Sequence, residues 1–302
     1  MKILVTGATG YLGESFVQLL QNKYEIVALV RNNSNIEFLE KMNCDIQRYF
    51  NDNDILDIFK MHDFDGVVHF ASNVSVNHIY DDISNLINSN ITFGTLLLEA
   101  SVITKVKWFV NTGTFWQNYQ NESNNPVNLY AATKEAFENI ARFYTETSNL
   151  IFTTIKLNDT FGPRDKRAKI FNLWSSIALS GEKFKMSAGE QIIDISYIDD
   201  VLSAYEQLLK HLSSDKAATF KDRIFVVTNK EKVTLRELAR LFERVTHSKL
   251  NIVWGGREYR EREVMSPYSL GLTVPGWRQQ YSLEDAIYKI ERVLHNNQNK
   301  RY

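Results

Sequence analysis

Short apolar runs alternate with segments whose apolar residues recur every three or four positions along the first half of the chain. The runs predict buried β-strands, and the periodic segments predict helices that pack one face against them. Strands separated by helices of this length pair in parallel through right-handed crossovers, so the pattern predicts a doubly wound α/β sheet of the Rossmann type. The predicted strands are 3–5, 26–30, 66–71, 108–110 and 151–157, and the predicted helices are 13–20, 87–101 and 129–144.

The regular alternation of strand and helix patterns ends after residue 157. The elements predicted there are a polar turn at 160–165, a helix at 171–178, a strand and a helix within 192–212, and a strand at 224–228. Thr234 and Ser282 each precede a carboxylate by three residues, a capping box that predicts the start of a helix. We therefore expect two domains, a Rossmann domain and a smaller C-terminal α/β domain for substrate. Their predicted extents are 1–157 plus about 190–212 for the first, and about 158–189 plus 213–302 for the second.

Composition and charge disfavour a nucleic-acid-binding, a membrane-bound or a metal-binding protein. The 302 residues are 44% hydrophobic and carry a formal net charge of −1, which favours neither nucleic acid nor an anionic membrane as a partner. No uninterrupted apolar run approaches the roughly 20 residues of a membrane span. Cys44 is the single cysteine, and no Cys/His spacing suggests a metal site. We expect a cytoplasmic protein that holds no metal.

Three glycines, Gly7, Gly10 and Gly13, lie between the first strand and the first helix. Glycine allows a tight turn and a close approach of the backbone to a pyrophosphate, and the N-terminus of the helix offers free N–H groups to that anion. The spacing differs from the standard Gly-x-Gly-x-x-Gly, and a tight strand-to-helix connection alone remains the alternative. We expect a dinucleotide to bind here, with contacts from Thr9, Tyr11 and Leu12 as well.

The end of the second strand bears on the choice of dinucleotide. NAD-binding folds usually place an acidic residue there, against the ribose 2′-hydroxyl. This chain has Arg31 and Asn32 instead, with no carboxylate before Glu37. Because an arginine can pair with a 2′-phosphate, the sequence favours NADP(H) over NAD(H). The alternative is a solvated surface arginine.

Tyr130 and Lys134 are four residues apart on one face of a predicted helix. A tyrosine with its ordinary pKa near 10 is a poor acid or base at neutral pH, and a neighbouring ammonium is expected to lower that pKa. Thr112 and Thr114 follow a predicted strand and therefore lie at the carboxyl edge of the sheet, where doubly wound sheets bind ligands. Together these groups can bind a carbonyl oxygen and transfer its proton.

The ordered set of motifs resembles the extended short-chain dehydrogenase/reductases along nearly the whole chain. Besides the glycine loop and the Tyr130–Lys134 pair, the matching motifs are residues 68–71, 90–95, 162–165, 197–201 and 275–277. Members of that superfamily act on nucleotide-linked sugars as epimerases, dehydratases and reductases. Within it, the chain is most similar to the CDP-abequose and CDP-paratose synthases, which reduce a 4-keto-3,6-dideoxy sugar.

The resemblance implies roles for individual positions. Tyr130 would be the acid–base, Lys134 would hold the nicotinamide ribose, and Thr114 would replace the usual serine, with Thr112 as the alternative. Further contacts to the cofactor would come from Phe70, Ala71, Ser72, Asn90 and Thr112, and contacts to the substrate from Thr114, Trp116, Asp159, Asn172 and Arg262. For Arg262 a solvated charged stretch is the alternative. The helix that carries Tyr130 would also pair with its twin in a homodimer.

Three positions depart from the family pattern. Ile193 stands where many relatives have an arginine, and Asp159 stands where an asparagine is frequent. Phe115 and Trp116 replace the Asp-Glu pair of the 4,6-dehydratases, which removes the acid and base that water elimination needs.

We therefore expect an NADP(H)-dependent reductase of a 4-keto (deoxy)sugar linked to a nucleoside diphosphate. The alternative is a nucleotide-sugar 4-epimerase that keeps NAD tightly bound. A non-catalytic dinucleotide sensor is disfavoured, because such proteins typically lack the tyrosine or the lysine and this chain retains both.

Overall fold

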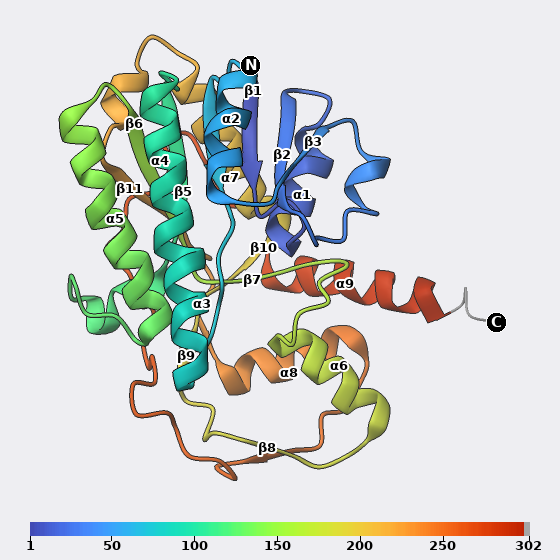
Figure 1. Cartoon of the computed structure of the whole chain (residues 1–302). Helices are drawn as coiled ribbons and strands as arrows, with labels where there is room; N and C mark the ends of the chain where they lie inside the picture. The colour runs from blue at the N-terminus through green and yellow to red at the C-terminus, as the bar shows by residue number, and fades with distance from the viewer. Residues whose placement is uncertain (299–302) are drawn as a thin grey trace.

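A parallel sheet of seven strands forms the centre of the molecule, as the sequence pattern predicts (Figure 1). The structure, a computed structural model, describes residues 1–298. The strand order is β11-β6-β5-β4-β1-β2-β3, and the order reverses between β1 and β4. The strands are β1 (Lys2–Thr6), β2 (Glu25–Arg31), β3 (Asp45–Tyr49), β4 (Gly66–His69), β5 (Trp108–Thr114), β6 (Ile151–Leu157) and β11 (Arg223–Val227). Ligands of doubly wound sheets bind at this reversal, outside the carboxyl ends of the strands.

Helices cover both faces of the sheet. On one face lie α2 (Asp52–Met61), α4 (Phe93–Ile103) and α5 (Leu129–Thr147), and on the other lie α1 (Tyr11–Leu20) and α7 (Ile198–Leu212). The alternation within β1 shows how the two cores arise: Leu4 packs on the side of α2, α4 and α5, whereas Ile3 and Val5 pack on the side of α1 and α7. Both faces are apolar because both are buried.

The sequence pattern missed two neighbouring elements, β3 and α2. Strand β3 is at the edge of the sheet, and its residues are exposed or half-buried, so it lacks the apolar run of a central strand. Helix α2 is amphipathic but begins in a polar stretch, where the Asn51 side chain caps Asn53 N–H and Asp54 completes a capping box. Strand β3 extends the sheet at its edge, and α2 packs against α4.

One helical segment contains a wide turn. The predicted helix at 87–101 is in fact α3 (Ile83–Ile87), a π-helical turn at Asn88–Thr92, and α4. Together with the preceding 3₁₀ turn it forms one helix, Tyr80–Ile103, that is long and apolar enough by length and composition to span a membrane. A buried core helix passes the same test, and Leu97 and Leu98 of this helix pack in the core beneath α2 and α5.

The C-terminal elements gather below the carboxyl edge of the sheet (Figure 1). They are β7 (Asp159–Phe161), α6 (Ile170–Ser180), β8 (Phe184–Met186), β9 (Ile192–Ile193), β10 (Ile195–Tyr197), β12 (Val233–Thr234), α8 (Leu235–Thr246), β13 (Ile252–Trp254) and α9 (Leu283–Gln298). The capping boxes at Thr234 and Ser282 begin α8 and α9 as predicted. Phe171 and Phe242 pack in the same apolar cluster as Ile3 and Val5 of the sheet. The division into two domains stays a prediction.

Candidate active site

The glycine loop packs so closely that side chains are excluded. Gly7 has a φ of +67°, and a Cβ there would lie 2.5 Å from the backbone nitrogen of Ala71. A Cβ on Gly13 would lie 2.2 Å from the carbonyl oxygen of Gly7. Helix α1 begins at Tyr11 with Gly10 as its N-cap, so no side chain caps the first N–H groups. This loop fits a pyrophosphate, which needs a close backbone and free N–H donors.

A cavity of about 260 Å³ opens between the glycine loop, the ends of β4, β5 and β6, and the start of α5. It gathers most residues that the sequence nominates for cofactor and substrate. Those that line it are Gly7, Gly10, Tyr11, Leu12, Gly13, Phe70, Ser72, Thr112, Thr114, Trp116, Tyr130, Lys134 and Asp159. Val74, Val76 and Leu157 add an apolar patch to the same wall. We call this space the catalytic cavity.

Helix α5 presents Tyr130 and Lys134 to the catalytic cavity. Its N-terminus is fixed by Asn128, whose side chain accepts a hydrogen bond of 3.0 Å from Ala131 N–H. Burial raises the pKa of Tyr130 to about 12, against the effect of a hydrogen bond with Ser72. Burial lowers the pKa of Lys134 to about 8. The expected lowering of the pKa of Tyr130 by Lys134 is not found in this structure, because desolvation of the phenolate is the largest effect and Lys134 is not among the groups that shift this pKa.

These two pKa values determine the protonation states of Tyr130 and Lys134. At neutral pH Tyr130 is a protonated phenol and Lys134 an ammonium. A phenol is ready to donate a proton, and a nearby positive charge stabilises the anion left behind.

Asn90 joins three segments around Tyr130. Its Oδ1 accepts hydrogen bonds from Ser72 Oγ (3.0 Å) and Asn73 N–H (2.7 Å). Its Nδ2 donates to Asn73 O (2.9 Å) and to Thr133 Oγ1 of α5 (2.9 Å). The side chain is fully buried within the π-helical turn. The structure thus brings Asn90 against the loop after β4 and outside the lining of the catalytic cavity, and its contacts position Ser72 and α5.

The two threonines of β5 differ in their partners. Thr112 Oγ1 is 2.7 Å from Tyr205 Oη of α7 and is held there. Thr114 Oγ1 accepts a weak hydrogen bond of 3.3 Å from Trp116 N–H and can still donate its proton. The Trp116 ring meets the Tyr130 ring edge to face at 6.5 Å. These contacts favour Thr114 over Thr112 as the hydroxyl beside Tyr130.

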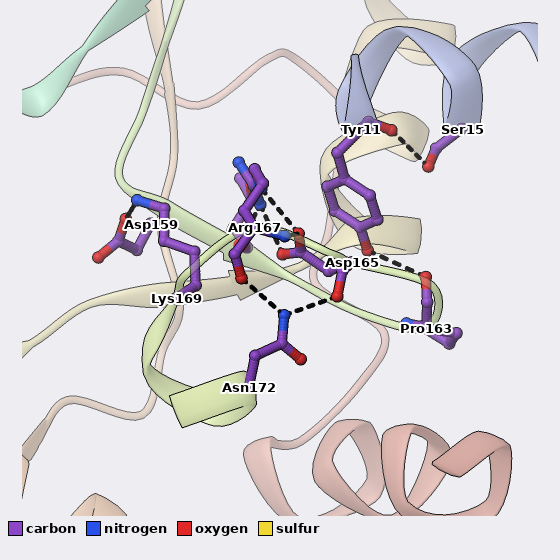
Figure 2. Close-up of polar contacts among 9 residues, drawn as sticks. Tyr11, Ser15, Asp159, Pro163, Asp165, Arg167, Lys169 and Asn172 are labelled. Carbon is purple, nitrogen blue, oxygen red and sulfur yellow. Dashed lines mark hydrogen bonds and ion pairs between the residues drawn. The ribbon is translucent and has the colours of Figure 1, made fainter. Parts of the chain in front are cut away.

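The segment after β7 contributes Arg167 and Lys169 to the lining of the catalytic cavity, and Figure 2 shows its polar contacts. Lys169 Nζ pairs with Asp159 Oδ1 at 2.5 Å. Arg167 pairs with Asp165 at 2.8 Å, and its guanidinium lies 4.7 Å from the centroid of the Tyr11 ring. Both Arg167 and Lys169 line the cavity, and both were missed from sequence; the turn at 162–165 was the signal that could have found them.

Seven of the site residues expected from the sequence do not line the catalytic cavity. Asn172 donates to the carbonyl oxygens of Asp165 (2.6 Å) and Arg167 (2.8 Å), so its amide shapes the loop (Figure 2). Arg262 donates to Asn125 Oδ1 and covers the Tyr119 ring at 4.3 Å. The other five are Thr9, Arg31, Asn32, Ala71 and Asn90.

The end of β2 is open to solvent. Arg31 and Asn32 are exposed, and Arg48 of β3 donates to the carbonyl oxygens of Arg31 (3.3 Å), Asn32 and Ser34 (3.4 Å). Arg48 therefore fixes this loop and adds a second positive charge, a feature that sequence reasoning missed because β3 was missed.

Comparison with known proteins identifies the family. The NAD dependent epimerase/dehydratase family matches residues 3–226, which include the glycine loop and the Tyr130–Lys134 pair. The chain belongs to this family. The expected resemblance is thus confirmed, and the family region covers the whole sheet almost to the end of β11.

Several curated relatives share the full length of this family member. The chain is 28% identical over 294 residues to a CDP-abequose synthase of Salmonella muenchen, covering 96% of each protein. It is 27% identical over 271 residues to a CDP-abequose synthase of Yersinia pseudotuberculosis, covering 88% of this chain and 92% of the relative. These matches confirm the predicted similarity to that group.

Solved structures share the fold. A UDP-glucose 4-epimerase of Thermotoga maritima, solved with UDP-glucose, superposes with a TM-score of 0.84 at 22% identity and covers 99% of this chain and 100% of the epimerase. A UDP-glucuronic acid 4-epimerase of Bacillus cereus, solved with UDP-glucuronic acid and NAD, gives a TM-score of 0.83 at 20% identity, covering 98% and 100%. At these identities the likeness establishes the Rossmann architecture.

Proposed function

We propose that this protein reduces the 4-keto group of a deoxysugar linked to a nucleoside diphosphate, with NADP(H) as cofactor. The observation that carries the proposal is that Tyr130 and Lys134 line the same cavity as a glycine loop that fits a pyrophosphate. The full-length similarity to CDP-abequose synthases supports the substrate class.

Tyr130, Thr114 and Lys134 have separate roles in one reduction. When bound, the nicotinamide supplies the hydride. Tyr130 gives its phenolic proton to the oxygen of the developing alkoxide, and the Thr114 hydroxyl donates a second hydrogen bond to that oxygen. The Lys134 ammonium stabilises the resulting phenolate. The apolar patch of Val74, Val76 and Leu157 suits a sugar that has lost hydroxyl groups, because a buried hydroxyl without a partner is unfavourable.

The choice of NADP(H) is supported by charge at the end of β2. Arg31 ends β2, where an NAD-binding fold usually places a carboxylate, and no carboxylate follows it before Glu37. Arg48 of β3 contacts the loop that follows Arg31. NAD is present in the solved structure of the Bacillus cereus epimerase, which keeps NAD(H) as the alternative cofactor.

A nucleotide-sugar 4-epimerase is the second candidate, favoured by the structural neighbours. The decisive experiment offers NADPH and NADH separately to the protein with enzymatically prepared CDP-, dTDP-, UDP- and GDP-linked 4-keto sugars and follows absorbance at the nicotinamide band. Stoichiometric oxidation of NADPH supports the reductase. If neither NADPH nor NADH is oxidised, and the protein interconverts the two C4 epimers of a nucleotide-linked 4-hydroxy sugar, the reductase is overturned in favour of the epimerase.

We also propose a cytoplasmic homodimer. Helices α4 and α5 pack side by side on the outside of the sheet (Figure 1). Ile103 of α4 is 49% exposed and Phe143 of α5 is 62% exposed. Exposed apolar side chains on adjacent helices are typical of a surface that meets another chain.

A further inference from the structure

Gln117 is a fully buried amide that the mechanism above does not use. It ends a 3₁₀ turn, Phe115–Gln117, that directly follows β5. Its Oε1 accepts a hydrogen bond of 2.8 Å from the backbone N–H of Thr114, and its Nε2 donates one of 2.8 Å to Glu135 Oε2 of α5. The amide also donates to the carboxylate of Glu138. An amide paired at both ends favours one arrangement of its neighbours, because a shift of either partner leaves a buried polar group unpaired.

The turn after β5 is closed by a capping box around Thr114. Residues 114–117 read Thr-x-x-Gln, the pattern of this motif. Thr114 Oγ1 accepts the bond from Trp116 N–H, and the Gln117 side chain reaches back to Thr114 N–H. A single turn therefore holds both the backbone and the hydroxyl of Thr114.

Gly113, between the two threonines of β5, makes room for the amide. A Cβ at Gly113 would lie 2.8 Å from Gln117 Oε1 and 2.8 Å from Cγ of Lys156. A side chain at this position would therefore displace one of the two. Lys156 of β6 in turn donates to Asn118 Oδ1 at 2.8 Å, so the segment after β5 is tied to β6 as well as to α5.

We propose that Gln117 is a positioning residue that fixes the Thr114 hydroxyl relative to Tyr130. The proposal rests on the proposed function, in which both groups meet the same oxygen of the substrate. Gln117 joins the Thr114 backbone to Glu135, on the helix that carries Tyr130. Trp116 of the same turn contacts the Tyr130 ring. The spacing of the two groups matters for rate, because a misplacement of about 1 Å can cost about 10²-fold.

Gln117→Met tests this role, because it removes the amide and keeps a side chain of similar length. We expect kcat to fall about tenfold while KM for the sugar nucleotide changes by less than about twofold. Thr114→Val removes the hydroxyl itself. If Gln117 acts through Thr114, adding Gln117→Met to Thr114→Val should lower kcat further by less than about twofold. Losses that multiply in the double variant, or an unchanged kcat in Gln117→Met, would overturn the proposal.

Asn111→Leu is the matched control. Asn111 is another fully buried amide of β5, and it donates to Thr154 Oγ1 at 3.1 Å. Neither Asn111 nor Thr154 lines the catalytic cavity. The control should lower the free energy of unfolding in urea, as Gln117→Met does, but leave kcat unchanged. An equal loss of kcat in the control would show that the effect is not specific to Gln117 and would overturn the proposal.

Gln117→Asn replaces Gln117→Met if the latter does not fold. It keeps a buried amide, but its side chain is one methylene too short to reach both Thr114 and Glu135. The same loss of kcat is expected, again without a further loss in the Thr114→Val background. Wild-type kcat in Gln117→Asn would contradict the positioning role.

NMR of the ligand-free protein separates this proposal from the proposed function. Three-bond couplings to the Thr114 methyl group report its χ1 angle and should show a single rotamer in the wild type. The couplings should average between rotamers in Gln117→Met and match the wild type in Asn111→Leu. A single, unchanged rotamer in Gln117→Met would refute the positioning role whatever the reaction. Absence of ketoreductase activity in the wild type would overturn the proposed function and leave the rotamer result intact.

Discussion

Replacing Lys134 by methionine is expected to make the protein more stable while it abolishes catalysis. The Lys134 side chain is 2% exposed, and burial lowers its pKa from an ordinary 10.5 to about 8. Each pH unit of difference between folded and unfolded pKa corresponds to about 1.4 kcal/mol, so holding the ammonium in the folded protein costs about 3 kcal/mol. Methionine fills a similar volume without a charge.

The sign and the pH window follow from the lowered pKa. Between pH 8 and pH 10.5 the unfolded chain binds more protons at this lysine than the folded protein does, so the wild type gains stability as the pH rises through that range. Below pH 8 both states are protonated, and the full deficit of about 3 kcal/mol is present. Lys134→Met lacks this dependence, so its advantage is largest at neutral pH and shrinks toward pH 10.5.

Urea denaturation followed by tryptophan fluorescence measures the difference at pH 7 and pH 9.5. Lys41→Met, at an exposed position, is the control and should shift the free energy of unfolding by less than about 0.5 kcal/mol at either pH. The reasoning is refuted if Lys134→Met is no more stable than the wild type at pH 7, or if the difference between the two is the same at both pH values.

Three further outcomes are expected. Tyr130→Phe should lower kcat by about 10²- to 10⁴-fold and leave the affinity for the dinucleotide nearly unchanged by fluorescence titration; an equal loss of affinity would make the residue structural. Arg31→Glu should weaken NADPH binding while NADH binding changes little, and an unchanged ratio of the two dissociation constants would show that Arg31 does not contact the 2′-phosphate. Sedimentation at micromolar concentration should show twice the 35.0 kDa mass of the chain, and a species of 35.0 kDa alone would reject the homodimer.

The central strands were predictable because each is buried on both faces. Such strands read as continuous apolar runs, as residues 26–30 and 66–69 do. The edge strand β3 escaped the same reasoning because one side of it meets solvent and its residues are mixed. Because β3 was not predicted, Arg48 was not recognised as a residue that contacts the loop after β2, where the cofactor is expected.

In the candidate site, the positions of residues within one helix could be predicted from their spacing in the sequence. Contacts between different elements could not be predicted in this way. Tyr130 and Lys134 are four residues apart, so the helix alone places them together. The pKa of Tyr130 depends instead on how completely surrounding segments bury it, which the spacing does not contain. Arg167 likewise reaches the catalytic cavity because the loop after β7 folds back over Tyr11, a contact between residues 156 positions apart that no local pattern reports.

The side-chain amide of Asn90 makes four hydrogen bonds, which restrict movement at one side of the catalytic cavity. Its two acceptor and two donor contacts tie the loop after β4 to α5, so one wall of the catalytic cavity moves only if several hydrogen bonds break together. The segment at 159–169 is held by the Lys169–Asp159 ion pair, by hydrogen bonds of Arg167 to Thr160 and Asp165, and by the amide of Asn172. A ligand in the catalytic cavity would therefore lie beside two segments that are each fixed by several side-chain hydrogen bonds.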